Sequence, residues 1–166
     1  MEVYVLDSNF FIQAHRLHYP LDVAYGFWNK VKQLAEKGKI TSIDKVKYEL
    51  YDKNDELETW CVDNLPEDFF KDTSHVIAEY GQVSAWAISK SNHYLQNALN
   101  EFLDANEADA FLVAYALADL NNRIIVTQEI SHPARQNKVK IPDACNALSV
   151  RYANTIDMFR RLGETF

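Results

Sequence analysis

Residues 1–12 read MEVYVLDSNFFI, a short apolar run that is followed directly by three polar residues, Asp7-Ser-Asn. The run from Val3 to Leu6 predicts a buried β-strand, because it is apolar and uninterrupted. Asp7 therefore lies where the chain leaves the core. Taken in isolation, its carboxylate is explained equally well as the cap of a following helix or as a group that binds a positive charge.

Short β-type runs alternate with segments of helical periodicity along the rest of the chain. The predicted strands after the first are KITSI at 39–43, RIIVT at 123–127, KVKI at 138–141 and VRYAN at 150–154. The first predicted helix starts at Ser8 or Asn9. Six more are predicted at 21–37, 44–51, 55–65, roughly 74–89, roughly 92–103 and 106–120. Two further helices start at Pro142 and at Thr155, and Thr155 is the expected cap of the last one. Strands separated by helices predict an α/β sandwich with a mainly parallel sheet.

The length of 166 residues, 48% of them hydrophobic, suits one domain with a sizeable core. We expect a single domain over 1–166, with a helical elaboration at about 52–105. The sequence contains no apolar stretch of the roughly 18 residues needed to cross a membrane, and it starts directly on a strand, so we expect a cytoplasmic protein. The net charge of −7 argues against broad electrostatic binding to nucleic acid, although a local patch with a bound cation stays compatible with it.

Three further acids lie next to core sequence, as Asp7 does. Glu49 follows the apolar stripe of the predicted 44–51 helix. Asp109 comes three residues after Asn106, the expected N-cap of a helix that is apolar nearly all round. Glu129 lies just past the end of the RIIVT strand. Because ligands of parallel α/β sheets bind outside the carboxyl ends of the strands, these acids could converge on one pocket.

Each of these acids also has an ordinary structural explanation. Asp109 could complete a capping box with Asn106, Glu49 could be a solvated helix residue, and Glu129 could be a loop acid. If they do converge, two carboxylates about 4 Å apart repel by roughly 4 kcal/mol at an effective dielectric of 20, so the site needs a retained proton or a bound cation. Ligands that are all oxygen suit Mg²⁺ or Mn²⁺. Such ions polarise phosphoryl oxygens and lower the pKa of bound water, which is the chemistry of phosphodiester hydrolysis.

Four stretches of the sequence resemble the PIN-domain family, the fold of VapC-type endoribonucleases. VYVLDSNFF is similar to the opening strand with its Asp, KYEL to the helix of the second acid, EADAFLVAYAL to the helix of the third acid, and RIIVTQEIS to the strand that ends in a Thr and the fourth acid. The resemblance implies a three-layer α/β/α sandwich with a mainly parallel central sheet and many helices, in a helix-richer branch of the family.

The resemblance also implies roles for individual residues. It carries over Asp7, Glu49 and Asp109 as catalytic metal ligands, with Glu129 as the fourth at a position where many relatives have Asp. Asn9 and Thr127 are expected to support the cluster through hydrogen bonds. The candidate RNA contacts are the basic residues that flank the acids, Lys45, Lys47, Arg135 and Lys138.

The function that this resemblance implies is a Mg²⁺- or Mn²⁺-dependent endoribonuclease. It would be the toxin of a type II toxin–antitoxin pair, cleaving RNA such as tRNA, inhibited by a cognate antitoxin protein and often homodimeric. Two alternatives stay open. A PIN-like domain that only binds a partner is expected to lack one of the first three acids, and all three are present. A haloacid-dehalogenase-like phosphohydrolase would use Asp7 as its nucleophile and a second Asp two residues on, where this chain has Asn9.

Overall fold

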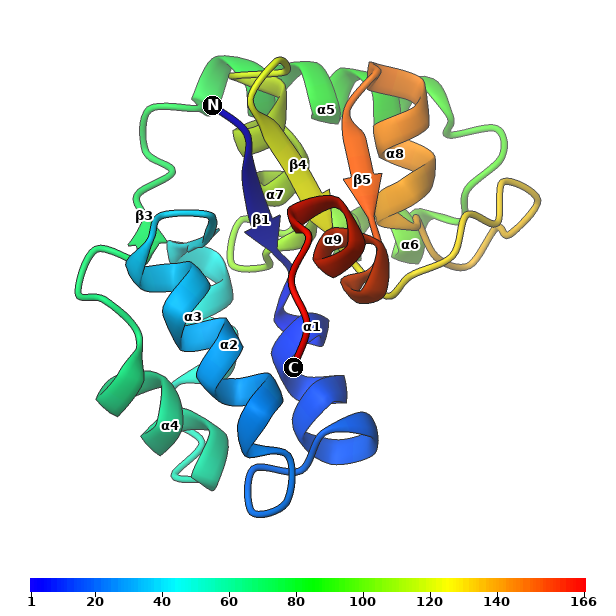
Figure 1. Cartoon of the computed structure of the whole chain (residues 1–166). Helices are drawn as coiled ribbons and strands as arrows, with labels where there is room; N and C mark the ends of the chain where they lie inside the picture. Colours follow the sequence, from blue (N-terminus) through cyan, green and yellow to red (C-terminus); the bar gives the residue numbers. More distant parts are fainter.

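The computed structural model describes residues 1–166 and contains five strands in one parallel sheet, ordered β3-β2-β1-β4-β5 (Figure 1). The strands are β1 Val3–Leu6, β2 Ile40–Ile43, β3 Phe70–Lys71, β4 Arg123–Val126 and β5 Arg151–Ala153. The predicted α/β sandwich with a mainly parallel sheet is confirmed, and every strand pair in it is parallel.

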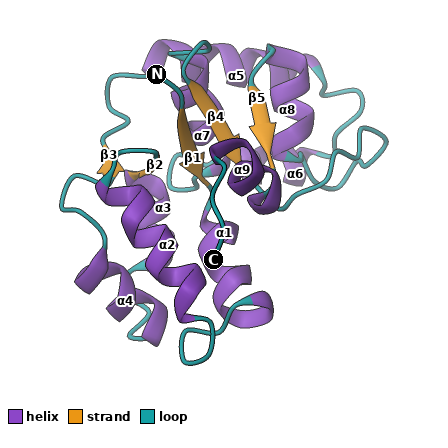
Figure 2. Ribbon diagram, in the orientation of Figure 1, coloured by secondary structure: helices purple, strands orange, loops and turns teal.

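Nine α-helices connect the strands (Figure 2). They are α1 Ser8–Gln13, α2 Tyr25–Glu36, α3 Asp44–Leu50, α4 Glu56–Asn64, α5 Ile77–Ser89, α6 Gln96–Phe102, α7 Asp109–Leu117, α8 Ile141–Leu148 and α9 Thr155–Leu162, and a π-helix, η1 Ala14–His18, continues α1. Helices α5, α7 and α8 pack together on one face of the sheet. Helices α2 and α9 cover the other face, where the ring centroids of Phe27 and Phe159 lie 5.9 Å apart. None of the helices has the length and apolar character that crossing a membrane requires.

The order of the strands creates a switch point between β1 and β4. The chain runs from β1 outward to β2 and β3, and then returns past β1 to form β4 and β5. Since such crossovers are right-handed, the connections after β1 and β4 leave toward opposite faces of the sheet. A crevice at the carboxyl ends of these two strands is where open parallel sheets bind their ligands. Leu6 pairs with Val126 at this end, so Asp7 and Thr127 leave the sheet side by side.

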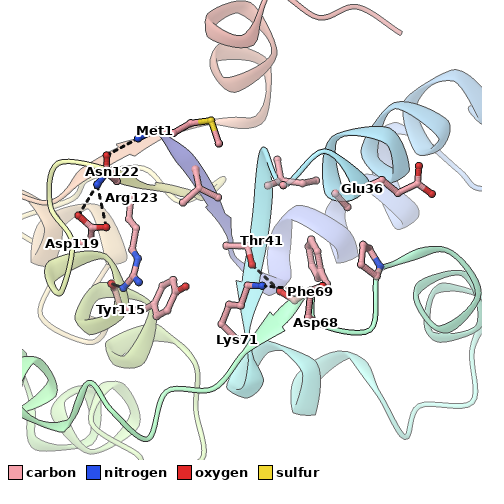
Figure 3. A pocket seen from close by; sticks show the side chains of 15 residues that line it. Met1, Glu36, Thr41, Asp68, Phe69, Lys71, Tyr115, Asp119, Asn122 and Arg123 are labelled. Atoms are coloured by element: carbon pink, nitrogen blue, oxygen red, sulfur yellow. Dashed lines mark hydrogen bonds and ion pairs between the residues drawn. The ribbon is translucent and has the colours of Figure 1, made fainter.

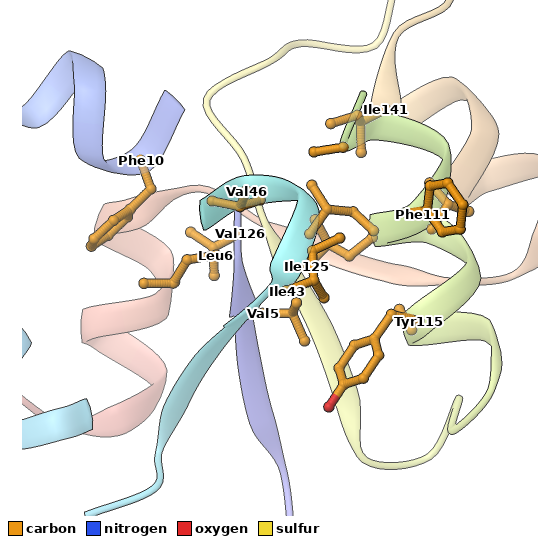
Figure 4. Close-up of a cluster of buried hydrophobic side chains, with 14 of the residues drawn as sticks. Val5, Leu6, Phe10, Ile43, Val46, Phe111, Tyr115, Ile125, Val126 and Ile141 are labelled. Atoms are coloured by element: carbon orange, nitrogen blue, oxygen red, sulfur yellow. The ribbon is translucent and has the colours of Figure 1, made fainter. Parts of the chain in front are cut away.

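A core cluster of 44 buried hydrophobic residues holds the layers together. Figure 4 shows Val5 and Ile125 of the sheet beside Phe111 and Tyr115 of α7. Seven consecutive residues of α7, Ala110–Ala116, are buried, which explains why this helix is apolar on nearly all sides. A helix that is packed all round is fixed in position, and so is the carboxylate at its first residue.

The N-terminal boundary of four predicted helices is wrong. Helix α5 begins at Ile77 rather than at residue 74, and α6 begins at Gln96 rather than at residue 92. Helix α2 begins at Tyr25 rather than at residue 21, because residues 21–24 form a turn in which the N–H groups of Val23 and Ala24 donate to the Pro20 carbonyl. Helix α7 covers Asp109–Leu117 rather than 106–120, so Asp109 is its first residue and not its third.

The predicted caps of α7 and α9 are also wrong. Asn106 does not cap α7, because the N-cap position is occupied by Ala108; Asn106 lies in the preceding turn, where its N–H donates to Asp104 Oδ1 (2.9 Å). The cap of α9 is Asn154 rather than Thr155, since Asn154 Oδ1 accepts from the Asp157 N–H at 2.8 Å.

The predicted strand KVKI does not form, and one strand was not predicted. Residues 138–140 are extended but unpaired, and Ile141 opens α8, where the N–H of Ile141 donates to Glu129 Oε2 (2.7 Å) instead of to a neighbouring strand. The strand that was not predicted, β3, is one of the two edge strands and pairs with β2 through Ser42 and Phe70. With two residues it is too short to show an alternating pattern.

Candidate metal centre

Asp7 sits at the carboxyl end of β1, and both of its carboxylate oxygens accept hydrogen bonds. Its side chain caps α1 by accepting from the Asn9 N–H (3.5 Å) and from Ser8 Oγ (3.3 Å) at Oδ1, while Thr127 Oγ1 donates to Oδ2 (3.0 Å). The residue is 1% exposed. The two explanations of Asp7, a helix cap and a charged site residue, are therefore compatible, because capping leaves a buried carboxylate at the switch point.

Asp109 opens α7 near the Asp7 carboxylate. Burial is the largest of the causes that raise the pKa of Asp109 to about 8; the charges of Asp7 and Glu129 act in the same direction, and that of Lys138 opposes them. Burial likewise raises the pKa of Asp7 to about 6, followed by the charge of Glu129, against the hydrogen bond from Thr127. Negative charges of other acids in the cluster thus raise the pKa of each of the two aspartates. The sheet and α7 bring them together although they lie far apart in the sequence.

Glu49, on α3, contacts the N-terminus of α7. Its Oε1 accepts the N–H of Ala108 (3.0 Å), the N-cap residue of α7, so a side chain of another helix supplies the cap predicted for Asn106. The charge of Glu49 also contributes to the raised pKa values of Asp7 and Asp109. A further acid that was not predicted, Glu107, lies next to Glu49, and partial burial and the Glu49 charge raise the pKa of Glu107. In the sequence, Glu107 could have been recognised as a site candidate by its position two residues before Asp109.

Glu129, after β4, combines a structural and an electrostatic role. Its side chain is 9% exposed, and it accepts the N–H of Ile141 at the start of α8. Lys138 Nζ lies 3.9 Å from Glu129 Oε1 and 3.7 Å from Glu101 Oε1. Lys138 is thus a counter-charge of the cluster, a placement that the sequence pattern did not indicate.

The predicted supporting residues differ in how they contact Asp7. Thr127 is 2% exposed, donates to Asp7 and accepts the Glu129 N–H at 3.1 Å, so it links the two acids. Asn9 contacts Asp7 through its backbone N–H rather than through its side chain. An additional acid, Asp143, accepts from Ser131 and His132 and anchors the loop after Glu129.

Of the other three basic residues named from the sequence, Lys45 and Lys47 lie on α3, and Arg135 lies in the loop between β4 and α8. Lys45 Nζ is 4.9 Å from the ring centroid of Phe111, and Lys47 Nζ is 5.3 Å from that of Tyr51. Arg135 donates from Nε to Asn137 Oδ1 (2.7 Å). Their role as RNA contacts stays a prediction.

The donor chemistry of the cluster fits a hard divalent cation. All side-chain donors are carboxylate oxygens, joined by the hydroxyl of Thr127, and the charge of Lys138 opposes the rise in the pKa of Asp109. As the side chains lie, no group of three or more His, Cys, Asp or Glu is arranged to hold a metal ion. Instead, Glu49 and Glu129 each use one oxygen to accept a backbone N–H. The chemistry of the acids therefore suits a cation, while Glu49 and Glu129 accept hydrogen bonds from backbone N–H groups at the starts of α7 and α8.

A different cavity, of about 350 Å³, lies at the opposite, amino end of the sheet (Figure 3). Its polar groups are paired with one another: Arg123 Nη1 donates to the Tyr115 carbonyl (2.6 Å), and the N-terminal ammonium of Met1 donates to Asn122 (3.1 Å). None of the predicted site residues lines it. The candidate chemistry is therefore confined to the carboxyl ends of the strands.

The raised pKa values predict how the stability of the metal-free protein depends on pH. Both values exceed the 3.8 of an ordinary Asp, so the folded state binds these protons more tightly than the unfolded chain does. The stabilisation is complete below about pH 4 and is lost as the pH rises through about 6 for Asp7 and about 8 for Asp109. We expect Asp109→Asn to flatten the fall in Tm between about pH 5 and 8, and to raise Tm at pH 8 by roughly 3 °C or more.

Thermal unfolding followed by circular dichroism in the presence of a chelator measures this effect. The matched control is Asp22→Asn, which makes the same change at an exposed residue in the turn before α2. It should keep the pH dependence of the wild type. Parallel pH profiles for the wild type and Asp109→Asn would contradict the prediction.

Fold and site together define a class of protein, an α/β domain with a cluster of carboxylates at the switch point of its parallel sheet. Residues 4–166 match the family described as "Domain of unknown function (DUF4411)", and the chain belongs to this family. A comparison with curated proteins gave no match. Among solved structures, the chain is similar to one chain of "Crystal structure of VapBC2 from Rickettsia felis bound to a DNA fragment from their promoter". The two are 20% identical, the similarity covers 92% of this chain and 98% of that chain, and the TM-score is 0.49.

Proposed function

We propose that the protein is a PIN-type endoribonuclease that hydrolyses RNA phosphodiester bonds with Mg²⁺ or Mn²⁺. The observation that supports the proposal is that Asp7, Glu129 and Glu49 lie near enough to Asp109 for their charges to raise its pKa, although no three of these acids are arranged to hold an ion as the side chains lie. These acids come from four separate segments of the chain, and their charges act on Asp109 together. A purely structural role would not require one buried and three partly buried acids to lie in the same region against one lysine. The sequence resemblance to the PIN family supports the same assignment.

The four acids would hold the divalent ion, and the ion when bound would polarise a phosphoryl oxygen and lower the pKa of a water molecule. The other residues of the site act on the acids. Thr127 and the Asn9 N–H fix the orientation of the Asp7 carboxylate, so its position does not depend on a ligand. Lys138 offsets part of the negative charge beside Glu129.

The biological setting that we propose rests on the sequence resemblance alone. In this setting the protein is the toxin of a type II toxin–antitoxin pair, a cognate antitoxin protein inhibits it, and its substrate is a structured RNA such as tRNA. A homodimer belongs to the same proposal. The basic residues Lys45, Lys47 and Arg135 are candidate RNA contacts in this scheme.

The direct test is cleavage of an end-labelled tRNA transcript by the purified protein. We expect discrete internal fragments with Mn²⁺ or Mg²⁺, no fragments after addition of a chelator, and recovery when excess Mn²⁺ is restored, because the acids need the cation to act on a phosphodiester. DNA of the same sequence serves as the control substrate. An absence of fragments from every RNA tested with either ion would favour a domain that only binds a partner.

A further inference from the structure

A second cavity, of about 250 Å³, adjoins the acid cluster, because Glu49 belongs to both. Its apolar wall includes Leu50 and Leu57, which are 2% and 3% exposed. Two cations with exposed side chains, Arg16 and Lys53, line it from η1 and from the turn after α3. This cavity therefore brings positive charge next to a strongly acidic site, in a chain whose net charge is −7.

The segment that carries Arg16 has an unusual backbone. Helix α1, which Asp7 caps, continues without a break into the π-helix η1. The N–H of Tyr19 donates to the Ala14 carbonyl five residues earlier (2.6 Å). Such wide turns are rare in proteins and are found frequently at functional sites. Here the wide turn places His15 and Arg16 in the wall of the cavity.

A residue of the same wall, His15, has an unpaired polar atom. The Nδ1 atom of His15 is buried and has no hydrogen-bond partner. An unsatisfied buried polar atom costs about 1–3 kcal/mol, so in folded proteins such atoms are few and call for an explanation. Because this atom has no accessible surface, the His15 ring must turn toward the cavity before a polar group of a ligand can become its partner.

The acids that line the cavity have other partners. Asp55 caps α4 by accepting the Glu58 N–H at Oδ1 (2.9 Å), and Glu49 accepts the Ala108 N–H at Oε1 (3.0 Å). Arg16 and Lys53 have no ion-pair partner in the structure. Two cations without carboxylate partners beside a cluster of acids suit an anion that must approach that cluster.

We propose that this cavity binds one backbone phosphate of the RNA, on the nucleotide next to the bond that is cleaved. Arg16 and Lys53 pair with the phosphate oxygens, and His15 bonds to a polar group of the same nucleotide. An arginine fork matches a phosphate geometrically, and a lysine adds a point charge. The volume lies below the roughly 300–1,000 Å³ of sites that enclose a whole drug-sized ligand, and so suits one phosphate with its sugar. This subsite rests on the proposed nuclease function and names how that function recognises its substrate.

The test is RNA binding in the presence of a chelator, so that the readout does not depend on cleavage. Fluorescence anisotropy with a labelled single-stranded RNA is measured over a salt series for Arg16→Gln, Lys53→Gln and the wild type. We expect each variant to bind about tenfold more weakly. The slope of log K against log salt should fall by about 0.7 for each lost phosphate contact. Lys37→Gln, an equal charge change at an exposed residue before β2, should match the wild type.

A third variant separates binding from folding. His15→Phe keeps a ring of similar size and removes the unpaired Nδ1 atom. We expect weaker RNA binding with an unchanged or higher Tm, because no hydrogen bond is lost in the free protein. A merely structural histidine would instead show a lower Tm with unchanged RNA affinity, which would count against its role in the subsite.

The outcomes distinguish this subsite from the proposed nuclease activity. Metal-dependent cleavage by the wild type, combined with unchanged affinity and salt slope in Arg16→Gln and Lys53→Gln, would overturn the subsite alone. Binding that depends on both cations without cleavage by the wild type would overturn the nuclease function alone. Equal losses of affinity for RNA and for DNA of the same sequence would support the phosphate contact and overturn its restriction to RNA.

Discussion

Asp7→Asn and Asp109→Asn are each expected to lower the rate of RNA cleavage by a factor of at least roughly 10² to 10³. Asparagine has nearly the same shape as aspartate, so the replacement removes charge while it leaves the side-chain volume unchanged. At position 7 the remaining carbonyl oxygen can still accept from Thr127, which preserves the contact between the ends of β1 and β4. At position 109 the replacement removes a carboxylate whose ionised form is disfavoured by the charges of Asp7 and Glu129. The loss of activity would therefore report on the charge of the site.

Initial rates on labelled RNA at saturating Mn²⁺ provide the measurement, and Asp22→Asn provides the matched control. Asp109→Asn adds an internal check, because the same variant is expected to be more stable than the wild type without metal. An inactive protein with a raised Tm cannot be explained by misfolding. Wild-type rates in both variants would rule out the acid cluster as the catalytic site.

Mg²⁺ or Mn²⁺ should raise the Tm of the wild type and should raise that of Asp7→Asn much less. A ligand that binds only the folded state stabilises it by about 2.7 kcal/mol at one hundred times its Kd, which corresponds to roughly 5–10 °C for a chain of this size. The cation would replace the proton that the raised pKa of Asp109 indicates. Protons and metal therefore compete, and we expect the rise in Tm to be larger at pH 8 than at pH 5.

Differential scanning fluorimetry with and without the chloride salts measures this rise, with NaCl at equal ionic strength to account for screening. Asp22→Asn should respond as the wild type does. A flat response of the wild type at pH 8 would mean that the acids keep their protons and bind no cation.

The parts of the fold that could be predicted from sequence are those whose signal is local. The run from Val3 to Leu6 and the run RIIVT form strands because both are short and mostly apolar. Asp7 is the residue directly after the first of these strands. Pro142 fixes the start of α8 in the same way. The four acids could be named because each adjoins a core element, and the parallel sheet then determines which strand ends meet.

The predictions that failed depended on partners distant in sequence. KVKI has the composition of a strand, but β1 and β5 already occupy both sides of β4, and the N–H of Ile141 donates to the Glu129 carboxylate. Asn106 is a good cap by residue type, yet Glu49 supplies the hydrogen bond at Ala108 from another helix. The placement of Lys138 beside Glu129 has the same origin. Tertiary contacts decided each of these cases, and a local pattern contains no information about them.

The hydrogen bond from Ala108 to Glu49 has a consequence for how the site communicates with the rest of the molecule. Glu49 and Ala108 are 59 residues apart. The Glu49 carboxylate accepts the backbone N–H at the N-terminus of α7, and it also belongs to the acid cluster. An ion that recruited Glu49 would compete with the N-terminus of a helix that is buried all round. Occupancy of the site and the order of the first turn of α7 would then be thermodynamically linked, so that each changes the free energy of the other. Through this shared carboxylate, a change in the charge of the site would alter the stability of α7, the helix at the centre of the core.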